Sequence, residues 1–458
     1  MSAFSTISLP SPLQQAVDAL GFTTMTPVQA QSLPALTGGR DVIAQARTGS
    51  GKTVAFGLGL LSRLDSGASG VQAAVLCPTR ELADQVAKEV RRLARFLPNI
   101  KVSILCGGVP LRVQVESLAH APHIVVGTPG RILEHLEKGS LDFSGLRMLV
   151  LDEADRMLDM GFEESMKAVI GYTPKERQTS LFSATFPESI RALCGNYLRD
   201  PVEVTVEVAH AADEIVQRFY EVEPDRKLDT LAWLLGEHKP EAAIVFCNTR
   251  RDTQDVAAAL DQRGFSVLAL HGDLEQRDRD EVLVRFANRS CTVLVATDVA
   301  ARGLDIQDLP VVITYDIASD ADTHIHRVGR TGRAGQKGLA LHLCTSREMQ
   351  RAKVIEERLG HALRWEVAKA APGRLKNGVL APMVTLVFDA GRKDKLRPGD
   401  ILGALTGSAG LPGDAVGKIA IFDTRAYVAI QRNQADKALE QLRAGKIKGR
   451  SVRVRKLA

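Results

Sequence analysis

The chain of 458 residues lacks the long apolar segments of a membrane protein. No apolar run reaches about 18 residues, the length that a membrane-spanning helix needs. Met1–Pro10 has no basic start followed by an apolar stretch, so it does not have the pattern of a secretory signal. We therefore expect no membrane partner and a cytoplasmic location.

Cysteine is scarce, and its spacing excludes two classes of site. The six cysteines include no C-x-x-C pair, which argues against a zinc ribbon or a disulfide framework. Five of them lie in or beside short apolar runs, and buried reduced thiols are the expectation: Cys77, Cys106, Cys247, Cys291 and Cys344. Aromatic residues are only 5% of the chain, so we predict aliphatic cores.

Charge is distributed unevenly along the chain. The segment 371–458 contains 17 Lys and Arg against 7 Asp and Glu, a balance of +10, whereas the remainder has 42 basic and 47 acidic residues. A basic tail on a mildly acidic body predicts a polyanionic partner for the tail. A merely solubilising surface is the alternative that charge alone leaves open.

Short apolar runs alternate with helical stretches through the first 367 residues. The runs are continuous rather than alternating, which is typical of parallel strands covered on both faces. The first set comprises Val42–Ala44, Ala73–Cys77, Lys101–Cys106, His123–Val126, Met148–Leu151 and Thr179–Ser183, and the second comprises Ala242–Cys247, Ser266–Leu270, Thr292–Ala296, Val311–Tyr315 and Leu339–Cys344. The pattern predicts an α/β fold with two doubly wound parallel sheets.

Two segments have the composition of linkers: Glu207–Glu214 and Ala368–Pro382. They divide the chain into expected domains at 1–207, 215–367 and 380–458. In the last of these, a strand at Met383–Asp389, a helix at Arg397–Leu405, strands within Lys418–Ile430, a helix at Gln434–Arg443 and a strand at Ser451–Arg455 are predicted. This order suits a small α+β fold of the RNA-recognition type.

A phosphate-binding loop follows the first predicted strand. Gly49, Ser50 and Gly51 let backbone N–H groups approach a phosphate, Lys52 can neutralise its oxygens, and the Thr53 hydroxyl can hold Mg²⁺. Ala46 stands where the pattern usually has its first glycine. For this loop alone, a Gly-rich turn with an incidental lysine is the alternative.

Carboxylates follow the apolar strand Met148–Leu151 directly. The carboxyl end of a buried parallel strand is where such sheets bind ligands. Asp152 is therefore a candidate to hold the metal, and Glu153 a candidate to orient and deprotonate the attacking water.

With Asp152-Glu153-Ala154-Asp155 in place, the sequence resembles the DEAD-box helicases, whose motifs run in the family's order across residues 4–335. The resemblance implies two tandem RecA-like domains and hydrolysis of ATP. Gly21-Phe22, Thr26-Pro27 and Gln29 resemble the Q motif, in which the glutamine reads adenine and an isolated aromatic, here Phe4, packs near the base. The same resemblance adds Thr48 to the nucleotide loop, and Gly303 and Asp305 to the nucleotide site through the ribose. It also assigns Arg330 and Arg333 to the γ-phosphate, where positive charge stabilises the transition state.

Further family motifs imply an RNA path. The residues are Pro78, Thr79, Arg80, Gly107, Gly108, Thr128, Pro129, Gly130 and Arg131 in the first domain, and Gly272, Arg279 and Thr297 in the second. Arg80, Arg131 and Arg279 either meet phosphates or brace the loops that do. Ser183 and Thr185 belong to the Ser-Ala-Thr motif, which in the family links ATP hydrolysis to strand separation. We infer a two-state cycle in which ATP and RNA together close the two domains.

The C-terminal domain lacks the usual base-stacking aromatics, since Phe388, Phe422 and Tyr427 do not fit their register. Its candidate RNA contacts are basic: Lys393, Lys395, Arg397, Lys446 and Lys448, together with Arg450 and Arg453. The segments Arg397–Gly407 and Gly445–Gly449 resemble one bacterial subfamily of DEAD-box proteins. That resemblance implies a monomer that docks on a hairpin of large-subunit ribosomal RNA in a pre-ribosomal particle.

Three alternatives remain open from the sequence. A DNA helicase could use the same frame, although the Q motif and the Asp-Glu-Ala-Asp sequence argue against it. An RNA clamp could bind ATP and hydrolyse it poorly, which intact Lys52, Glu153, Arg330 and Arg333 disfavour. The basic tail could also raise RNA affinity without any specificity.

Overall fold

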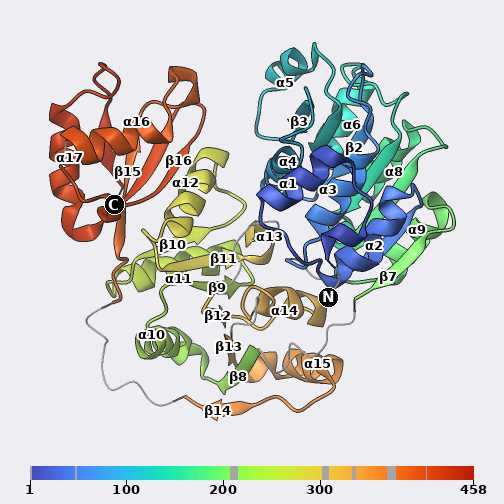
Figure 1. The fold of residues 1–458 in the computed structure, drawn as a ribbon. Helices are drawn as coiled ribbons and strands as arrows, with labels where there is room; N and C mark the ends of the chain where they lie inside the picture. Colours follow the sequence, from blue (N-terminus) through green and yellow to red (C-terminus); the bar gives the residue numbers. More distant parts are fainter. Residues whose placement is uncertain are drawn as a thin grey trace. The chain divides into compact units, whose positions relative to one another are not determined.

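The computed structural model describes residues 3–46, 49–206, 215–301, 309–332, 337–368, 378–408 and 410–457 (Figure 1). The chain divides into two compact units: residues 1–209 with 303–305, and residues 210–302 with 306–458. Each unit is described by itself.

The described part of the first unit has one parallel sheet in the order β3-β4-β2-β5-β6-β1-β7. Its strands are β1 Val42–Gln45, β2 Ala73–Leu76, β3 Val102–Leu105, β4 Ile124–Gly127, β5 Met148–Asp152, β6 Gln178–Ser183 and β7 Val202–Thr205. Its helices are α1 Ser11–Ala19, α2 Pro27–Thr37, α3 Lys52–Ser62, α4 Arg80–Leu93, α5 Leu111–Leu118, α6 Pro129–Glu137, α7 Ala154–Asp159, α8 Glu163–Gly171 and α9 Glu188–Tyr197.

Helices cover this sheet on both faces, as the continuous apolar strands predict. Val42 and Ala44 of β1 belong to one buried cluster with α1 to α4, while Ile43 between them belongs to another with α6 to α9. Alternate side chains of a strand point to opposite faces, so two apolar layers need uninterrupted apolar strands. The predicted parallel sheet is confirmed; β7, at its edge, was not anticipated.

The second unit holds a parallel sheet of the same kind, ordered β10-β11-β9-β12-β13-β8-β14. Its strands are β8 Ile215–Glu221, β9 Ala243–Cys247, β10 Val267–Leu270, β11 Val293–Thr297, β12 Val311–Thr314, β13 Gly338–Cys344 and β14 Trp365–Val367. Its helices are α10 Lys227–His238, α11 Arg250–Asp261, α12 Gln276–Ala287, α13 Asp298–Ala301, α14 Ala321–Val328 and α15 Met349–Leu359. The expected α/β fold is again confirmed.

The same unit contains a small antiparallel sheet ordered β16-β17-β15-β18. Its strands are β15 Met383–Phe388, β16 Val416–Ile421, β17 Ala426–Gln431 and β18 Val454–Lys456, and its helices are α16 Pro398–Gly403 and α17 Ala435–Ala444. Ala404–Ser408 continues α16 as a π-helical turn. Phe388 is fully buried in the core under the helices. The expected α+β domain is confirmed.

The open face of this small sheet is covered within its unit. Val387, Tyr427 and Leu457 form a buried cluster against which Val284 of α12 packs. A buried polar contact lies beside it, since Asn288 Nδ2 donates to Thr385 Oγ1 at 2.9 Å and Thr385 Oγ1 donates to Ser290 Oγ at 2.8 Å. The sheet face is therefore a packing surface.

The end of the second expected linker is also packed. Ala381 is fully buried, and its N–H donates to Ser266 Oγ at 2.9 Å. The N–H of Ser266 donates to the Val379 carbonyl at 3.3 Å. Residues 378–382 thus follow the start of β10 instead of running free. The first expected linker, 207–214, lies outside the described residues.

The six cysteines are all free and buried, as expected. Among the described residues, no helix has the length and apolar character to cross a membrane.

Two buried histidines pack together in the second unit: His324 on α14, the helix that leads into the arginine motif, and His342 on β13. The His342 ring stacks on Phe219 at 4.3 Å between centroids and lies 4.9 Å from the His324 ring. Neither ring nitrogen of His342 has a hydrogen-bond partner among the described residues. Burial lowers the pKa of His324 to about 4 and the pKa of His342 well below its ordinary 6.5.

These histidines predict acid sensitivity. Below pH 6.5, the pKa of an unfolded histidine, both histidines are protonated in the unfolded chain but stay neutral in the folded chain. Their contribution to stability is therefore complete above pH 6.5 and is lost as the pH falls below it. Each of these histidines lowers the free energy of unfolding by about 1.4 kcal/mol for each pH unit below 6.5. His342→Phe keeps the ring stack and is expected to reduce the loss of Tm between pH 7.5 and 5.5. The exposed His361→Phe is the control, and equal losses in both variants would contradict the prediction.

Candidate nucleotide and RNA site

The candidate residues of the first unit gather at one edge of its sheet. Gly49–Thr53 follows β1, Pro78–Arg80 follows β2, Gly107-Gly108 follows β3 and Thr128–Arg131 follows β4. Asp152 ends β5 and Ser183 ends β6. Because these strands are parallel, all six segments lie at the carboxyl ends, where open α/β sheets bind ligands.

The phosphate loop is held by the Q-motif glutamine. Gln29 Nε2 donates to the Gly51 carbonyl at 3.1 Å, and Gln29 Oε1 accepts from the Thr26 N–H at 2.9 Å. Gly51 has φ +88°, and a Cβ there would lie 2.5 Å from Gln29 Nε2. Glycine is thus required at this position both by its backbone and by its neighbour. Lys52 then begins α3, whose N-terminal N–H groups suit a phosphate.

Two opposite charges of this edge are buried without partners among the described residues. They are Lys52 Nζ and Asp152 Oδ1. Burial raises the pKa of Asp152 to about 7, with Glu153 adding to the rise and Lys52 opposing it. Unsatisfied buried charges are costly, and a nucleotide phosphate with Mg²⁺ would satisfy both. The residues present therefore fit these groups, with Thr53 beside Lys52 as a further oxygen ligand.

Glu153 is held in a strained and fixed conformation. Its φ of 53° and ψ of 53° are left-handed, which is rare for a residue with a side chain. Arg156 NH1 lies 2.8 Å from Glu153 Oε2, and the two side chains are only 3% and 5% exposed. The ion pair fixes the carboxylate at the end of β5, next to Asp152.

Asp155 joins this acidic motif to the Ser-Ala-Thr motif. Its Oδ2 accepts from the N–H groups of Ala184 and Thr185 at 3.1 and 2.8 Å, and from Thr185 Oγ1 at 3.0 Å. Ser183 Oγ accepts from the Asp155 N–H at 3.3 Å. A shift of the acidic motif would therefore move Ser183–Thr185, which is the connection a coupling role needs.

Phe4 is buried, with its ring stacked on Phe22 at 6.2 Å between centroids. It belongs to the apolar cluster of the first unit. Its expected contact with a base stays a prediction.

In the second unit, Arg327 ties three strand ends to α14. Its guanidinium donates to the carboxylate of Asp298 after β11 at 2.7 and 2.6 Å. It also donates to the side chain of Asn248 after β9 at 2.7 Å and to the carbonyl of Asp316 after β12 at 2.6 Å. The side chain is 1% exposed. Arg330, three residues further along, is buried as well.

Two of the three candidate RNA arginines brace loops. Arg131 NH1 donates to the Val109 carbonyl at 2.8 Å and to Gln114 Oε1 at 2.9 Å. Arg279 NH2 donates to the Ala300 carbonyl at 2.7 Å. The sequence left two roles open for these arginines, contact with a phosphate and bracing of neighbouring segments. The structure shows bracing hydrogen bonds for both Arg131 and Arg279.

The remaining candidate RNA residues lie in loops or at the starts of helices. Thr79 caps α4 by accepting from the Leu82 N–H at 3.3 Å, and Thr297 Oγ1 accepts from the Ala300 N–H at 3.4 Å. Arg80 NH1 is buried without a partner among the described residues. Pro78 and Pro129 are buried, Thr128 is half-buried, and Gly107, Gly108, Gly130 and Gly272 are exposed.

The basic candidates of the small domain are exposed and come from two loops. Lys393, Lys395 and Arg397 precede α16, and Lys446 and Lys448 follow α17. Lys448 Nζ joins the loops, since it donates to the Lys395 carbonyl at 2.9 Å and pairs with Asp400 at 2.9 Å. The fold thus brings together charges about fifty residues apart in the sequence.

Thr48, Gly303, Asp305 and Arg333, all expected at the nucleotide, lie outside the described residues. The residues that sequence reasoning missed are partners of motif residues: Asp155 and Arg156, Arg327, and Gln114. Asp155, Arg156 and Arg327 lie inside or beside recognised motifs, which was a usable signal. Gln114 lies in no motif.

Family models match parts of the chain that lie in each of the three sheets. A model of the DEAD/DEAH box helicase family matches residues 26–193, and one of the helicase conserved C-terminal domain matches 226–335. A model of the DbpA RNA binding domain matches 385–456. Together with the motifs at the sheet edge, these matches make the chain an ATP-dependent RNA helicase of the DEAD-box family, to which it belongs.

Within that family, the chain is 54% identical over 460 residues to the ATP-dependent RNA helicase DbpA of Escherichia coli (strain K12), covering 100% of both proteins. DEAD-box ATP-dependent RNA helicase CshA of Bacillus cereus is 43% identical over 357 residues, 78% of this chain and 68% of that protein. Among solved structures, S. cerevisiae Dbp5 bound to RNA and ADP BeF3 is similar with a TM-score of 0.72 and 28% identity, over 81% of this chain and 96% of that one. The chain is therefore a DbpA-like, RNA-dependent ATPase that uses ATP and carries its own RNA-binding domain.

Proposed function

We propose that this helicase anchors itself on a hairpin of large-subunit (23S) ribosomal RNA and unwinds neighbouring RNA in a cytoplasmic pre-ribosomal particle, acting as a monomer. The observation that carries the proposal is the exposed basic pair of loops joined by Lys448, in a domain that matches a DbpA RNA binding domain. Phosphate-rich, folded RNA is the polyanion that such a surface suits.

At the nucleotide, the roles follow from position and charge. Lys52 neutralises the phosphates, Thr53 and Asp152 hold Mg²⁺, and Glu153 takes the proton of the attacking water. Bound Mg²⁺ supplies a Lewis acid that offsets the developing charge. Arg330 and Arg333 add positive charge at the γ-phosphate. Gln29 and Phe4 recognise the base, Gly303 and Asp305 lie at the ribose, and Thr48 belongs to the phosphate-binding loop.

The enzyme grips an RNA strand only in the closed state of a two-state cycle. ATP and RNA together close the two RecA-like domains, and closure bends one strand so that local base pairs break. Asp155 transmits the state of the nucleotide to Ser183 and Thr185 through its carboxylate bonds. Phosphate release reopens the domains.

The targeting is tested by ATP hydrolysis with no nucleic acid, with DNA, with random RNA and with fragments of large-subunit rRNA. The double variant Lys393→Glu/Lys446→Glu reverses one charge in each basic loop. We expect it to lose at least tenfold of the stimulation by one rRNA fragment, while stimulation by random RNA stays. If the variant only weakened non-specific ionic attraction, stimulation by the rRNA fragment and by random RNA would both fall.

Lys418→Glu/Lys437→Glu is the matched control, because both lysines are exposed in the same domain but outside these loops. It should leave fragment selectivity unchanged. Equal stimulation of the native protein by every RNA would overturn the targeting and leave a general RNA helicase with a non-specific basic tail. Equal stimulation by DNA would favour the DNA-helicase alternative.

A further inference from the structure

Helix α5 is attached to its unit by a polar side chain. Only Gln114 and Leu118 of its eight residues are buried, while Val113 and Val115 are 53% and 40% exposed. Gln114 itself is 5% exposed. A buried glutamine on an otherwise exposed helix needs specific partners, because an unbonded amide in the interior is costly.

The amide of Gln114 joins three neighbours. Its Nε2 donates to the Cys106 carbonyl at 2.9 Å, and its Oε1 accepts from Arg131 NH1 at 2.9 Å. His135 Nε2 lies 3.0 Å from the same oxygen. Since the guanidinium can only donate, Oε1 must face Arg131, and the orientation of the amide is fixed.

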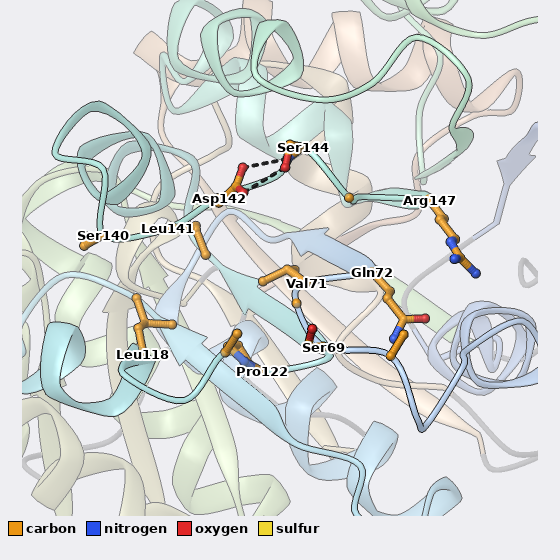
Figure 2. A pocket seen from close by; sticks show the side chains of 14 residues that line it. Ser69, Val71, Gln72, Leu118, Pro122, Ser140, Leu141, Asp142, Ser144 and Arg147 are labelled. Carbon is orange, nitrogen blue, oxygen red and sulfur yellow. Dashed lines mark hydrogen bonds between the residues drawn. The ribbon is translucent and has the colours of Figure 1, made fainter.

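The histidine continues this network. Because Gln114 Oε1 is an acceptor, His135 carries its proton on Nε2, and Nδ1 accepts from Ser140 Oγ at 2.8 Å. Burial, followed by the charge of Arg131, lowers the pKa of His135. Ser140 also lines a hollow of about 310 Å³, which Figure 2 shows with Leu118, near the amino ends of β2, β4 and β5 and thus at the opposite end of the strands from the motifs. The network thus ends at that hollow.

The partners of Gln114 belong to two separate segments of the proposed RNA path, the loop after β3 and the first turn of α6. Cys106 immediately precedes Gly107-Gly108, and Arg131 ends the Thr128–Arg131 segment. Arg131 also donates to the carbonyl of Val109, directly after the glycines. Gln114 and Arg131 therefore hold the residues on both sides of the glycine pair at a fixed distance from the first turn of α6.

We propose that Gln114, supported by His135, is a positioning residue that sets the spacing between the glycine loop after β3 and the first turn of α6, the two RNA-contacting segments of the first RecA-like domain. The inference rests on the proposed function in one respect, that these segments touch RNA. Gln114 acts only through Arg131 and the Cys106 carbonyl. Its loss removes the Gln114 partner of the Cys106 carbonyl and of His135 Nε2 and one of the two acceptors of Arg131 NH1, so the glycine loop is held less firmly.

The test uses the full chain and single-stranded random RNA, so that it does not depend on ribosomal targeting. Gln114→Met keeps the length of the side chain and removes every hydrogen bond. We expect the RNA concentration for half-maximal ATP hydrolysis to rise about tenfold, while the KM for ATP at saturating RNA is unchanged. Gln114→Glu can still accept from Arg131 and His135 but cannot donate to Cys106, so a smaller rise is expected.

Glu116→Met is the matched control on the same helix, because its exposed ion pair with Arg112 contributes little. Gly107→Asp separates the inference from its premise, since a Cβ at Gly107 meets nothing within 4 Å and the new carboxylate would repel RNA. An unchanged RNA requirement in Gly107→Asp overturns the premise that this loop touches RNA. A raised requirement in Gly107→Asp with none in Gln114→Met overturns the positioning role alone. A rise in the ATP KM of Gln114→Met equal to that for RNA also overturns it, since it indicates general damage.

Discussion

Replacing Glu153 by glutamine is expected to lower the RNA-stimulated kcat for ATP by about 10²- to 10⁴-fold, the usual contribution of a general base. The glutamine oxygen can still accept from Arg156 NH1, the partner at 2.8 Å, so the fixed position of the side chain survives and only its basicity is lost. The KM for ATP is expected to change little. Steady-state ATPase assays with saturating RNA measure both constants.

Glu176→Gln is the matched control for this change. Glu176 is 89% exposed and its ion pair with Arg199 lies at the surface, so the variant should hydrolyse ATP as the native protein does. Native turnover in Glu153→Gln would contradict the assigned role and restore the alternative of an RNA clamp that hydrolyses ATP poorly.

Replacing Arg327 by methionine is expected to destabilise the second unit by about 3 kcal/mol, the low end for a broken buried ion pair, because the Asp298 carboxylate that loses its charge partner is 22% exposed. It also releases the ends of β9, β11 and β12 from α14, so the helix that leads to Arg330 loses its position. We therefore expect ATP turnover to fall even at temperatures where the variant is folded. Urea unfolding and ATPase assays check the two effects separately.

Arg327→Lys distinguishes geometry from charge. A lysine keeps the charge but cannot reproduce the fork of donors to Asp298, Asn248 and the Asp316 carbonyl, so most of the loss should remain. Arg358→Met serves as the control, because Arg358 is 58% exposed and 3.8 Å from its partner Asp322. Native stability and turnover in Arg327→Met would show that the clamp is dispensable.

The strands of the two large sheets could be predicted because a strand covered on both faces must be apolar throughout. Val42–Ala44 and Met148–Leu151 are examples, and β1 and β5 extend them by one residue each. Three strands were missed: β7 and β14, which lie at sheet edges, and β8, which lies between β13 and β14 and is only partly buried along its length. Val202–Thr205 has exposed positions at Glu203 and Thr205, and Trp365 and Val367 are both exposed. Edge strands lack the continuous apolar signal.

The motif residues could be placed at one edge from the sequence, because each follows a predicted parallel strand. Their hydrogen-bond partners could not. Arg131 meets Gln114 and Val109 across a loop and a helix, and nothing in its local sequence selects those partners over a phosphate. The fold therefore shows the bracing contacts of Arg131, while its contact with a phosphate stays a prediction.

The sequence by itself determined the family, the α/β architecture and the order of motifs, because apolar periodicity and short motifs are local properties of the chain. Only the tertiary structure decided which buried charged groups have hydrogen-bond partners. Arg156 holds Glu153, whereas Lys52 Nζ and Asp152 Oδ1 have no hydrogen-bond partner among the described residues. It also covered the open face of the small sheet and joined Lys395 to Lys448. Such contacts depend on packing between distant segments, so no local pattern encodes them.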